Sequence, residues 1–205
     1  ADLGSTYSIE FFDQDSDGRE DEVAVGEEGE LRVYSDTGAS LYNKTEPYGV
    51  EFEVEKVDFD NDKIYDDILV TSNYNTVHAY NSSGSLQWTF NAPFQEYEEE
   101  FYAAYFLNLE VGDVDNDGFD EIIAGGYNRR YFVLNLSGNI TGKHYYGFES
   151  DLYPTNYIGS TTGESPGIDI VNDTNNDGLP EILSQRLSGY VYYGQEVMCK
   201  INISN

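Results

Sequence analysis

Short apolar runs alternate with clusters of polar turn residues along the chain. Runs such as "YSIEFF" (7–12) and "VEFEVEKV" (50–57) alternate apolar and polar positions, and clusters of Gly, Asn, Asp and Ser separate the runs from one another. Apolar residues at helical spacing are scarce, and the best helix candidate, residues 95–106, is short. The pattern therefore predicts an all-β protein with little helix.

One acidic segment occurs four times, each time just before an apolar run. The copies superimpose without gaps: "DQDSDGREDEVAVG" from Asp13, "DFDNDKIYDDILVT" from Asp58, "DVDNDGFDEIIAGG" from Asp113 and "DTNNDGLPEILSQR" from Asp173. Positions 1, 3 and 5 are Asp or Asn, and position 9 is always a carboxylate: Asp21, Asp66, Glu121 and Glu181. The starts are 45, 55 and 60 residues apart, which are spacings typical of propeller blades.

Each copy is surrounded by four extended runs, with the acidic loop between the first and the second. We therefore expect a single domain, residues 1–205, folded as a β-propeller of four four-stranded antiparallel blades. The blades are expected at about 7–45, 50–91, 104–145 and 166–204, with long connections at 91–104 and 145–167. A β-sandwich with acidic turns is the alternative, but it does not explain one template in four places.

The way in which the blades close stays open. No exchanged closing strand is evident, and four blades is the lower limit for a closed propeller. A compact four-blade ring, an open fragment of a longer protein and a subunit that pairs with its neighbour are all compatible with the pattern.

The acidic loops have the chemistry of a calcium site. Three carboxylates at alternating positions before a tight turn repel one another unless a cation lies between them, and oxygen-only ligands favour Ca²⁺. We assign positions 1, 3, 5 and 9 as side-chain ligands and position 7 as a backbone-carbonyl ligand, at Arg19, Ile64, Phe119 and Leu179. An EF-hand would need Glu at position 12, where the chain has Ala24, Leu69, Ala124 and Ser184.

The four segments resemble the D-x-D-x-D-G-x-x-D/E calcium loops of FG-GAP and VCBS-type repeats, the propeller family that includes the integrin α-subunit head. The resemblance covers about residues 7–204 and implies up to four structural calcium ions. It implies these ligands: Asp13, Asp15, Asp17 and Asp21; Asp58, Asp60, Asp62 and Asp66; Asp113, Asp115, Asp117 and Glu121; Asp173, Asn175, Asp177 and Glu181. Lys63 replaces the turn glycine and Asn175 removes one charge, so the second and fourth loops should bind more weakly.

Composition and charge exclude several functions. The chain has 39 acidic and 10 basic residues, and its net charge of -29 disfavours nucleic acid and anionic lipid as partners. No apolar stretch reaches the length of a membrane span. No nucleophile elbow or phosphate-binding loop is present, so we expect no enzymatic activity. A polysaccharide-active propeller enzyme is the least favoured alternative.

Calcium loops and glycosylation sequons both indicate an extracellular, secreted protein. Loops in extracellular modules bind calcium at about 10⁻⁴ to 10⁻³ M, a concentration found outside cells. Six N-x-S/T sequons occur, of which Asn172 is set aside because it adjoins Asp173. The candidate glycosylation sites are Asn43, Asn81, Asn135, Asn139 and Asn202.

Two classes of function fit this pattern. The first is a calcium-stabilised adhesion or recognition module that binds an extracellular protein or glycan through the connections 91–104 and 145–167, the second of which is rich in Tyr. The second is a glycosylated structural subunit that binds copies of itself in an extracellular fibre or surface layer. The pattern slightly favours recognition.

Overall fold

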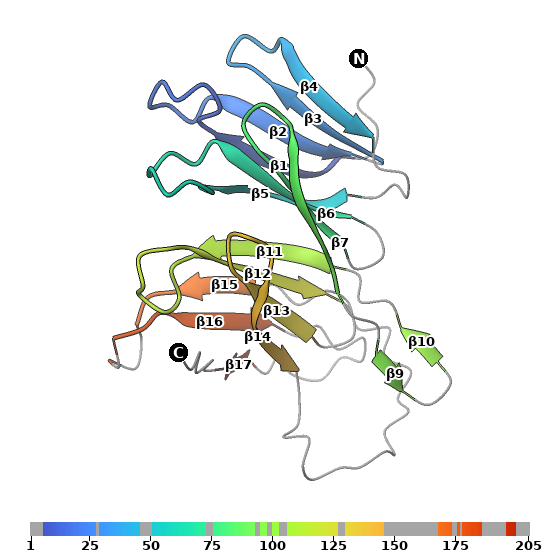
Figure 1. The fold of residues 1–205 in the computed structure, drawn as a ribbon, viewed down its shortest axis with the longest axis vertical. Helices are drawn as coiled ribbons and strands as arrows, with labels where there is room; N and C mark the ends of the chain where they lie inside the picture. The colour runs from blue at the N-terminus through green and yellow to red at the C-terminus, as the bar shows by residue number, and fades with distance from the viewer. Residues whose placement is uncertain are drawn as a thin grey trace.

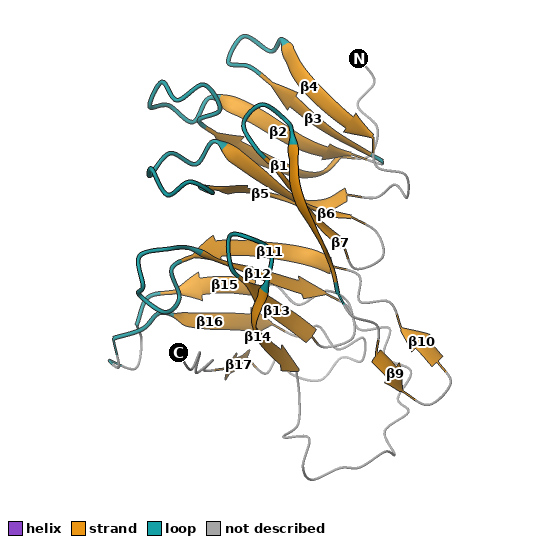
Figure 2. Cartoon of the chain, viewed as in Figure 1, coloured by secondary structure: helices purple, strands orange, loops and turns teal. Residues whose placement is uncertain are grey.

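The structure, a computed structural model, consists of β-strands and connecting loops. It describes residues 6–27, 29–45, 51–72, 76–92, 95–97, 100–102, 106–126, 130–145, 168–173, 176, 178–185 and 196–199. Every regular element in these ranges is a strand, which confirms the all-β prediction (Figure 2). A search of the same residues finds no helix with the length and apolar character needed to cross a membrane.

Three sheets have four antiparallel strands each, and their strand order follows the chain. The first sheet contains β1 (Thr6–Phe12), β2 (Glu22–Glu27), β3 (Glu30–Tyr34) and β4 (Ser40–Thr45). The second contains β5 (Glu51–Val57), β6 (Asp67–Ser72), β7 (Thr76–Tyr80) and β8 (Leu86–Asn91). The third contains β11 (Phe106–Gly112), β12 (Glu121–Gly126), β13 (Arg130–Leu134) and β14 (Ile140–Tyr145).

The last sheet differs from the prediction. It contains β15 (Ile168–Val171), β16 (Glu181–Gln185) and β17 (Glu196–Cys199), paired in that order. The sequence pattern places residues 197–204 ("VMCKINIS") in a fourth strand, whereas β17 pairs directly with β16 and is the third of the described strands. The preceding run, residues 186–195, and the connection 146–167 lie outside the described residues.

The connection between the second and third sheets is not a plain loop. It contains a two-stranded hairpin of β9 (Gln95–Tyr97) and β10 (Glu100–Tyr102), at the place of the short helix candidate. The two strands pair antiparallel, with Tyr97 opposite Glu100 and Gln95 opposite Tyr102.

The sheets follow one another in a row, from the first at the top of Figure 1 to the fourth at the bottom. The loops β1–β2, β5–β6, β11–β12 and β15–β16 all lie along the left edge of this row, so the four acidic segments share one side of the molecule (Figure 2). Within the described residues no strand of the fourth sheet is hydrogen-bonded to the first. The arrangement is propeller-like, with the first and fourth sheets at opposite ends of the row (Figure 1).

The core lies between the sheets. We call the side of a sheet that faces the next sheet its back and the opposite side its front; in the fourth sheet the front is the side that faces the third. Leu31 and Val33 on the back of the first sheet pack against Val54 and Ile68 on the front of the second, and all four are at most 1% exposed. The second and third sheets, and the third and fourth, are joined by equivalent apolar clusters. Because each sheet buries its face against a neighbour, the acidic loops are held on a rigid stack.

Candidate metal centres

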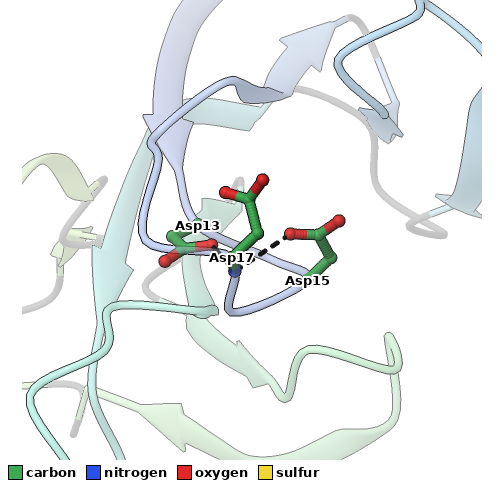
Figure 3. A group of neighbouring side chains, drawn as sticks. All are labelled: Asp13, Asp15 and Asp17. Carbon is green, nitrogen blue, oxygen red and sulfur yellow. Dashed lines mark hydrogen bonds between the residues drawn. The ribbon is translucent and has the colours of Figure 1, made fainter.

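Three of the four acidic loops bring their carboxylates together. In each loop, oxygens from three residues lie within 4.8 Å of one another. The groups are Asp13, Asp15 and Asp17 in the first loop (Figure 3); Asp58, Asp60 and Asp62 in the second; and Asp113, Asp115 and Glu121 in the third. The fourth loop is described only in part, since Asn175 and Asp177 lie outside the described residues.

The carboxylate at position 1 organises every loop. Asp13 Oδ1 accepts from Asp17 N at 2.9 Å, and Asp13 Oδ2 accepts from Gly18 N at 2.9 Å. Asp58 and Asp113 make the same pair of bonds to the amides at positions 5 and 6, and Asp173 makes the second of them. This side chain therefore folds the loop back on itself, which explains why position 1 is Asp in all four copies.

Carboxylates at position 5 fix the following residue. Asp17, Asp62 and Asp117 accept from the amides of Arg19, Ile64 and Phe119, at 2.8 to 3.0 Å. These bonds hold the backbone of position 7 beside the acidic group in three loops. They leave its side chain free to vary, and Phe119 is 52% exposed.

Two positions of each loop have left-handed backbone. Position 4 has φ of 58° to 60° in all four loops, at Ser16, Asn61, Asn116 and Asn176. Position 6 has φ of 88° to 92° where it is glycine, and Lys63 takes φ of 75° in the second loop. Lys63 is therefore strained in the backbone, because a side chain is disfavoured in this region.

Lys63→Gly is expected to stabilise the calcium-free protein by about 0.5 kcal/mol, since relief of about 1 kcal/mol of strain is partly offset by the entropy of glycine in the unfolded chain. Urea denaturation in excess chelator measures the change. Lys63→Ala is the matched control, because it removes the same charge but keeps a Cβ at this φ. An equal gain from both variants would contradict a backbone origin.

The residue that starts the second strand differs in register between the loops. By strand pairing, Glu121 lies opposite Gly112 at the start of β12, and the equivalent residues are Glu22, opposite Phe12, and Asp67, opposite Val57. Glu22, Asp67 and Glu121 also share one role, because each accepts from the backbone amide of loop position 2. Asp21 and Asp66 directly precede Glu22 and Asp67, and none of these four residues is in the three convergent groups, so their assignment as ligands stays a prediction.

The gapless superposition missed Glu22 and Asp67 because the first two loops are one residue longer between the turn and the strand. The available signal was the doubled acid, "DE" at 21–22 and "DD" at 66–67, directly before the apolar run. Asp66 still lies close to the second group. Desolvation by burial raises the pKa of its carboxyl group, and the charges of Asp60 and Asp62 raise it further.

Electrostatics indicate that the acidic groups favour a bound cation. Burial, followed by the charges of Asp115, Asp117 and Asp113, raises the pKa of Glu121 to about 7. Burial and the charge of Asp66 raise the pKa of Asp67 to about 6. A raised pKa means that the negative charge of the carboxylate is unfavourable at this place, and a bound proton or a bound cation compensates this charge. Oxygen donors in this number and density fit Ca²⁺, so the residues present suit the ion that the sequence predicts.

The sequence-predicted glycosylation sites differ in accessibility. Asn43 and Asn139 are exposed, whereas Asn81 and Asn135 are partly buried and their Oδ1 atoms accept turn amides. Asn202 lies outside the described residues. Among the described sequons, Asn43 and Asn139 are therefore the better candidates.

A second set of acidic residues lies on the first strand of each sheet, at one register position. Strand pairing places Glu10, Glu55, Glu110 and Asp169 at equivalent positions on β1, β5, β11 and β15. Burial, followed by the charges of Glu10, Glu110 and Glu53, raises the pKa of Glu55 to about 8. Burial and the charges of Asp169 and Glu10 raise the pKa of Glu110 to about 7. Sequence analysis did not identify this row, because a single acid in an alternating strand is unremarkable by itself.

Glu55→Gln is expected to stabilise the protein above pH 8 by about 1 to 2 kcal/mol, after allowance for solvent screening, and to have little effect near pH 4. The folded pKa of about 8 lies above the ordinary 4.5. The folded state therefore binds this proton more tightly, and stability falls as pH rises from 4.5 to 8. Thermal unfolding across this range measures the effect. Asp36→Asn, at an exposed turn residue, is the control of equal charge, and an equal gain from it would contradict the local explanation.

Comparison with known proteins supports the fold and the repeat. Residues 58–124 match the FG-GAP-like repeat family. This match includes the whole of the second acidic loop and the third loop up to Ala124 in β12. A search of curated proteins gives no match.

Several solved structures are similar in fold. The computationally designed Ika4 protein has a TM-score of 0.60 at 11% identity, over 98% of this chain and 94% of that one. BamB from Moraxella catarrhalis has a TM-score of 0.56 at 13% identity, over 89% of this chain and 47% of that one. BBS1N, solved in complex with ARL6DN, has a TM-score of 0.55 at 13% identity, over 88% of this chain and 45% of that one.

The chain thus spans less than half the length of BBS1N and BamB but nearly all of Ika4. At these identities the likeness concerns the fold alone. Together with the sheet order and the repeated loops, these findings describe an FG-GAP-like repeat at residues 58–124 within a row of β-propeller-like blades.

Proposed function

We propose that this protein is a non-enzymatic, calcium-stabilised module for adhesion or recognition outside the cell. The observation that carries the proposal is the convergence of carboxylates within 4.8 Å in three successive loops along one edge. Each ion bound there draws together a loop that joins the first two strands of a blade. Calcium binding is then coupled to folding, because the unfolded chain has no such cluster.

An extracellular location follows from the same chemistry. Loops of this kind in extracellular modules are matched to calcium at about 10⁻⁴ to 10⁻³ M. The exposed sequons at Asn43 and Asn139 support the same location, since a glycan at either site would project into solvent. The ligand surface is proposed on the edge opposite the acidic loops, where the β9–β10 hairpin connects the second and third sheets.

Calcium should raise the free energy of unfolding by about 1.4 to 2.7 kcal/mol per site at 10 to 100 times Kd. Thermal melts in millimolar calcium and in excess chelator measure this, with magnesium as the ion control because it demands stricter geometry. Replacing Asp15, Asp60 and Asp115 together by Asn should abolish the calcium increment while leaving the melt in chelator unchanged or higher. An identical melt with and without calcium would refute the proposal.

Recognition itself needs a separate measurement. The calcium-loaded protein should bind particular members of a glycan or extracellular-protein array and lose this binding in chelator. The Asn triple variant, in calcium, is the matched control. A calcium-dependent melt without any array binding would support the metal centres and contradict the recognition role.

A second candidate is a structural subunit of an extracellular polymer. The exposed apolar side chains on the front of the first sheet favour it, because Ile9 and Phe11 are 54% and 53% exposed. Such a subunit would use the same calcium loops to hold its blades rigid.

A further inference from the structure

The contact between neighbouring sheets follows one geometric rule. In each pair, the front of the later sheet packs on the back of the earlier one. On the first strand of the later sheet, Val54 of β5, Leu109 of β11 and Ile168 of β15 occupy one register position. They are 1%, 2% and 6% exposed, each in the cluster shared with the preceding sheet.

The front of the first sheet has the same apolar character, but Ile9 and Phe11 on it are exposed, while Val25 is 8% exposed. Ile9 holds the register position of Val54 and Leu109, opposite Val25 of β2. Phe11 lies two residues further along the same face, opposite Val23. Both side chains are more than half exposed, whereas Val54 and Leu109, the counterparts of Ile9, are almost fully buried. An apolar face of this kind is built to pack against the back of another blade.

Hydrogen bonds between neighbouring acidic loops also run from one sheet to the next one. Asn61 at position 4 of the second loop donates to Gly118 O at position 6 of the third, at 3.3 Å. Asn116 of the third loop donates in the same way to Gly178 O of the fourth. The fourth loop has Asn176 at the donor position, and the first loop has Gly18 at the acceptor position. The fourth loop therefore has a donor for such a bond, and the first loop has an acceptor.

The turns between the third and fourth strands also contact the preceding sheet in the same way. The α-carbon of Gly84 faces the ring of Tyr42 from the preceding sheet, and that of Gly138 faces the ring of Trp88, since a Cβ would lie 2.9 and 2.8 Å from those rings. Gly38, in the equivalent turn of the first sheet, has nothing within 4 Å of such a Cβ. A third, independent contact thus lacks its preceding partner at the first sheet.

We propose that the front of the first sheet binds the back of the fourth sheet of a second copy of this chain. The internal interfaces provide the template, because the docked copy would continue the row by the same front-to-back step. Val171 on β15, at the register position of Phe12 and Val57, is partly exposed on the back of the fourth sheet. The contact is head-to-tail, so the copies close as a ring or extend as a filament.

This interface deepens the structural-subunit candidate and does not depend on recognition of a foreign ligand. Each copy carries a net charge of -29, so association opposes strong repulsion and requires screening by salt or bound calcium. Failure of self-association would leave the calcium-dependent melt untouched, and loss of the calcium effect would leave the apolar contact testable on its own.

Light scattering after size-exclusion chromatography tests the interface across protein concentrations, in about 0.15 M salt with millimolar calcium. The chain should exceed its monomer mass of 23.1 kDa as concentration rises. Ile9→Lys combined with Phe11→Lys should weaken association by about 100-fold, because the contact would bury two charges. The fold should tolerate the change, since Lys56 of the second sheet already holds the position of Phe11.

The matched control is Leu86→Lys combined with Ile140→Lys, which adds the same charge at exposed apolar residues of the second and third sheets. These variants should associate as the unmodified chain does. Equal loss of association in both double variants would overturn the proposal, as would a monomer at every concentration.

Cross-linking fixes the partner face. A photoreactive phenylalanine analogue replaces Phe11 in a mixture of isotopically light and heavy chains. Mixed light–heavy products should join this position to residues 168–185 of the other chain. Products confined to a single chain would show that the fourth sheet of the same molecule covers the face, and front-to-front products would show a different dimer; either result overturns the proposal.

Discussion

Asp58→Ala should lower the free energy of unfolding by about 2 to 4 kcal/mol, because a hydrogen bond to a charged acceptor contributes about 1.5 to 3 kcal/mol and this variant loses two that are partly buried. Asp58 is 2% exposed. Its Oδ1 accepts from Asp62 N at 3.2 Å and its Oδ2 accepts from Lys63 N at 2.8 Å. Without this carboxylate the backbone of the second loop loses both bonds that fold it back.

The control for Asp58→Ala is Asp60→Ala in the same loop. Asp60 belongs to the same convergent group but is exposed. In chelator, Asp60→Ala should be neutral or slightly stabilising, because it removes a repulsive charge, whereas Asp58→Ala should be destabilising. In calcium both should lose the increment from the ion. Equal effects of the two variants in chelator would show that the position-1 carboxylate has no structural role beyond metal binding.

The repeat made most of the local structure predictable. Four acidic segments in register fixed the place of the β1–β2 type of loop in each sheet, and the structure has β2, β6, β12 and β16 directly after them. Carboxylates such as Asp13 and Asp15 were predicted as neighbours because alternating positions before a turn must converge. This inference used only local spacing.

Other features depend on pairing between strands, which spacing alone does not define. One additional residue in the first two loops moves the strand-start acid from Asp21 and Asp66 to Glu22 and Asp67. The row of Glu10, Glu55, Glu110 and Asp169 becomes visible only when four strands are aligned by their partners. The exposure of Ile9 likewise depends on packing, because Ile9 and Val54 occupy equivalent places in the sequence pattern and differ only in what covers them.

Gly138→Ala should destabilise the protein by about 3 kcal/mol, from a left-handed backbone cost near 1 kcal/mol and a steric clash of about 2 kcal/mol. Gly138 has φ of 76°, and a Cβ would lie 2.8 Å from the Trp88 ring. The indole is unable to retreat freely, because Trp88 Nε1 donates to Leu136 O at 2.9 Å and the ring packs edge-on against Phe59.

Gly38→Ala separates the two costs. Gly38 has φ of 75° in the equivalent turn, with nothing within 4 Å of a Cβ, so this variant should lose only about 1 kcal/mol. Denaturation at low protein concentration, where the front of the first sheet is free, compares the two. A Trp88→Ala background should remove most of the difference between them, since it deletes the ring that the Cβ meets. Equal losses in the unmodified background would instead attribute both effects to φ and would weaken the case that turn and ring pack together in successive blades.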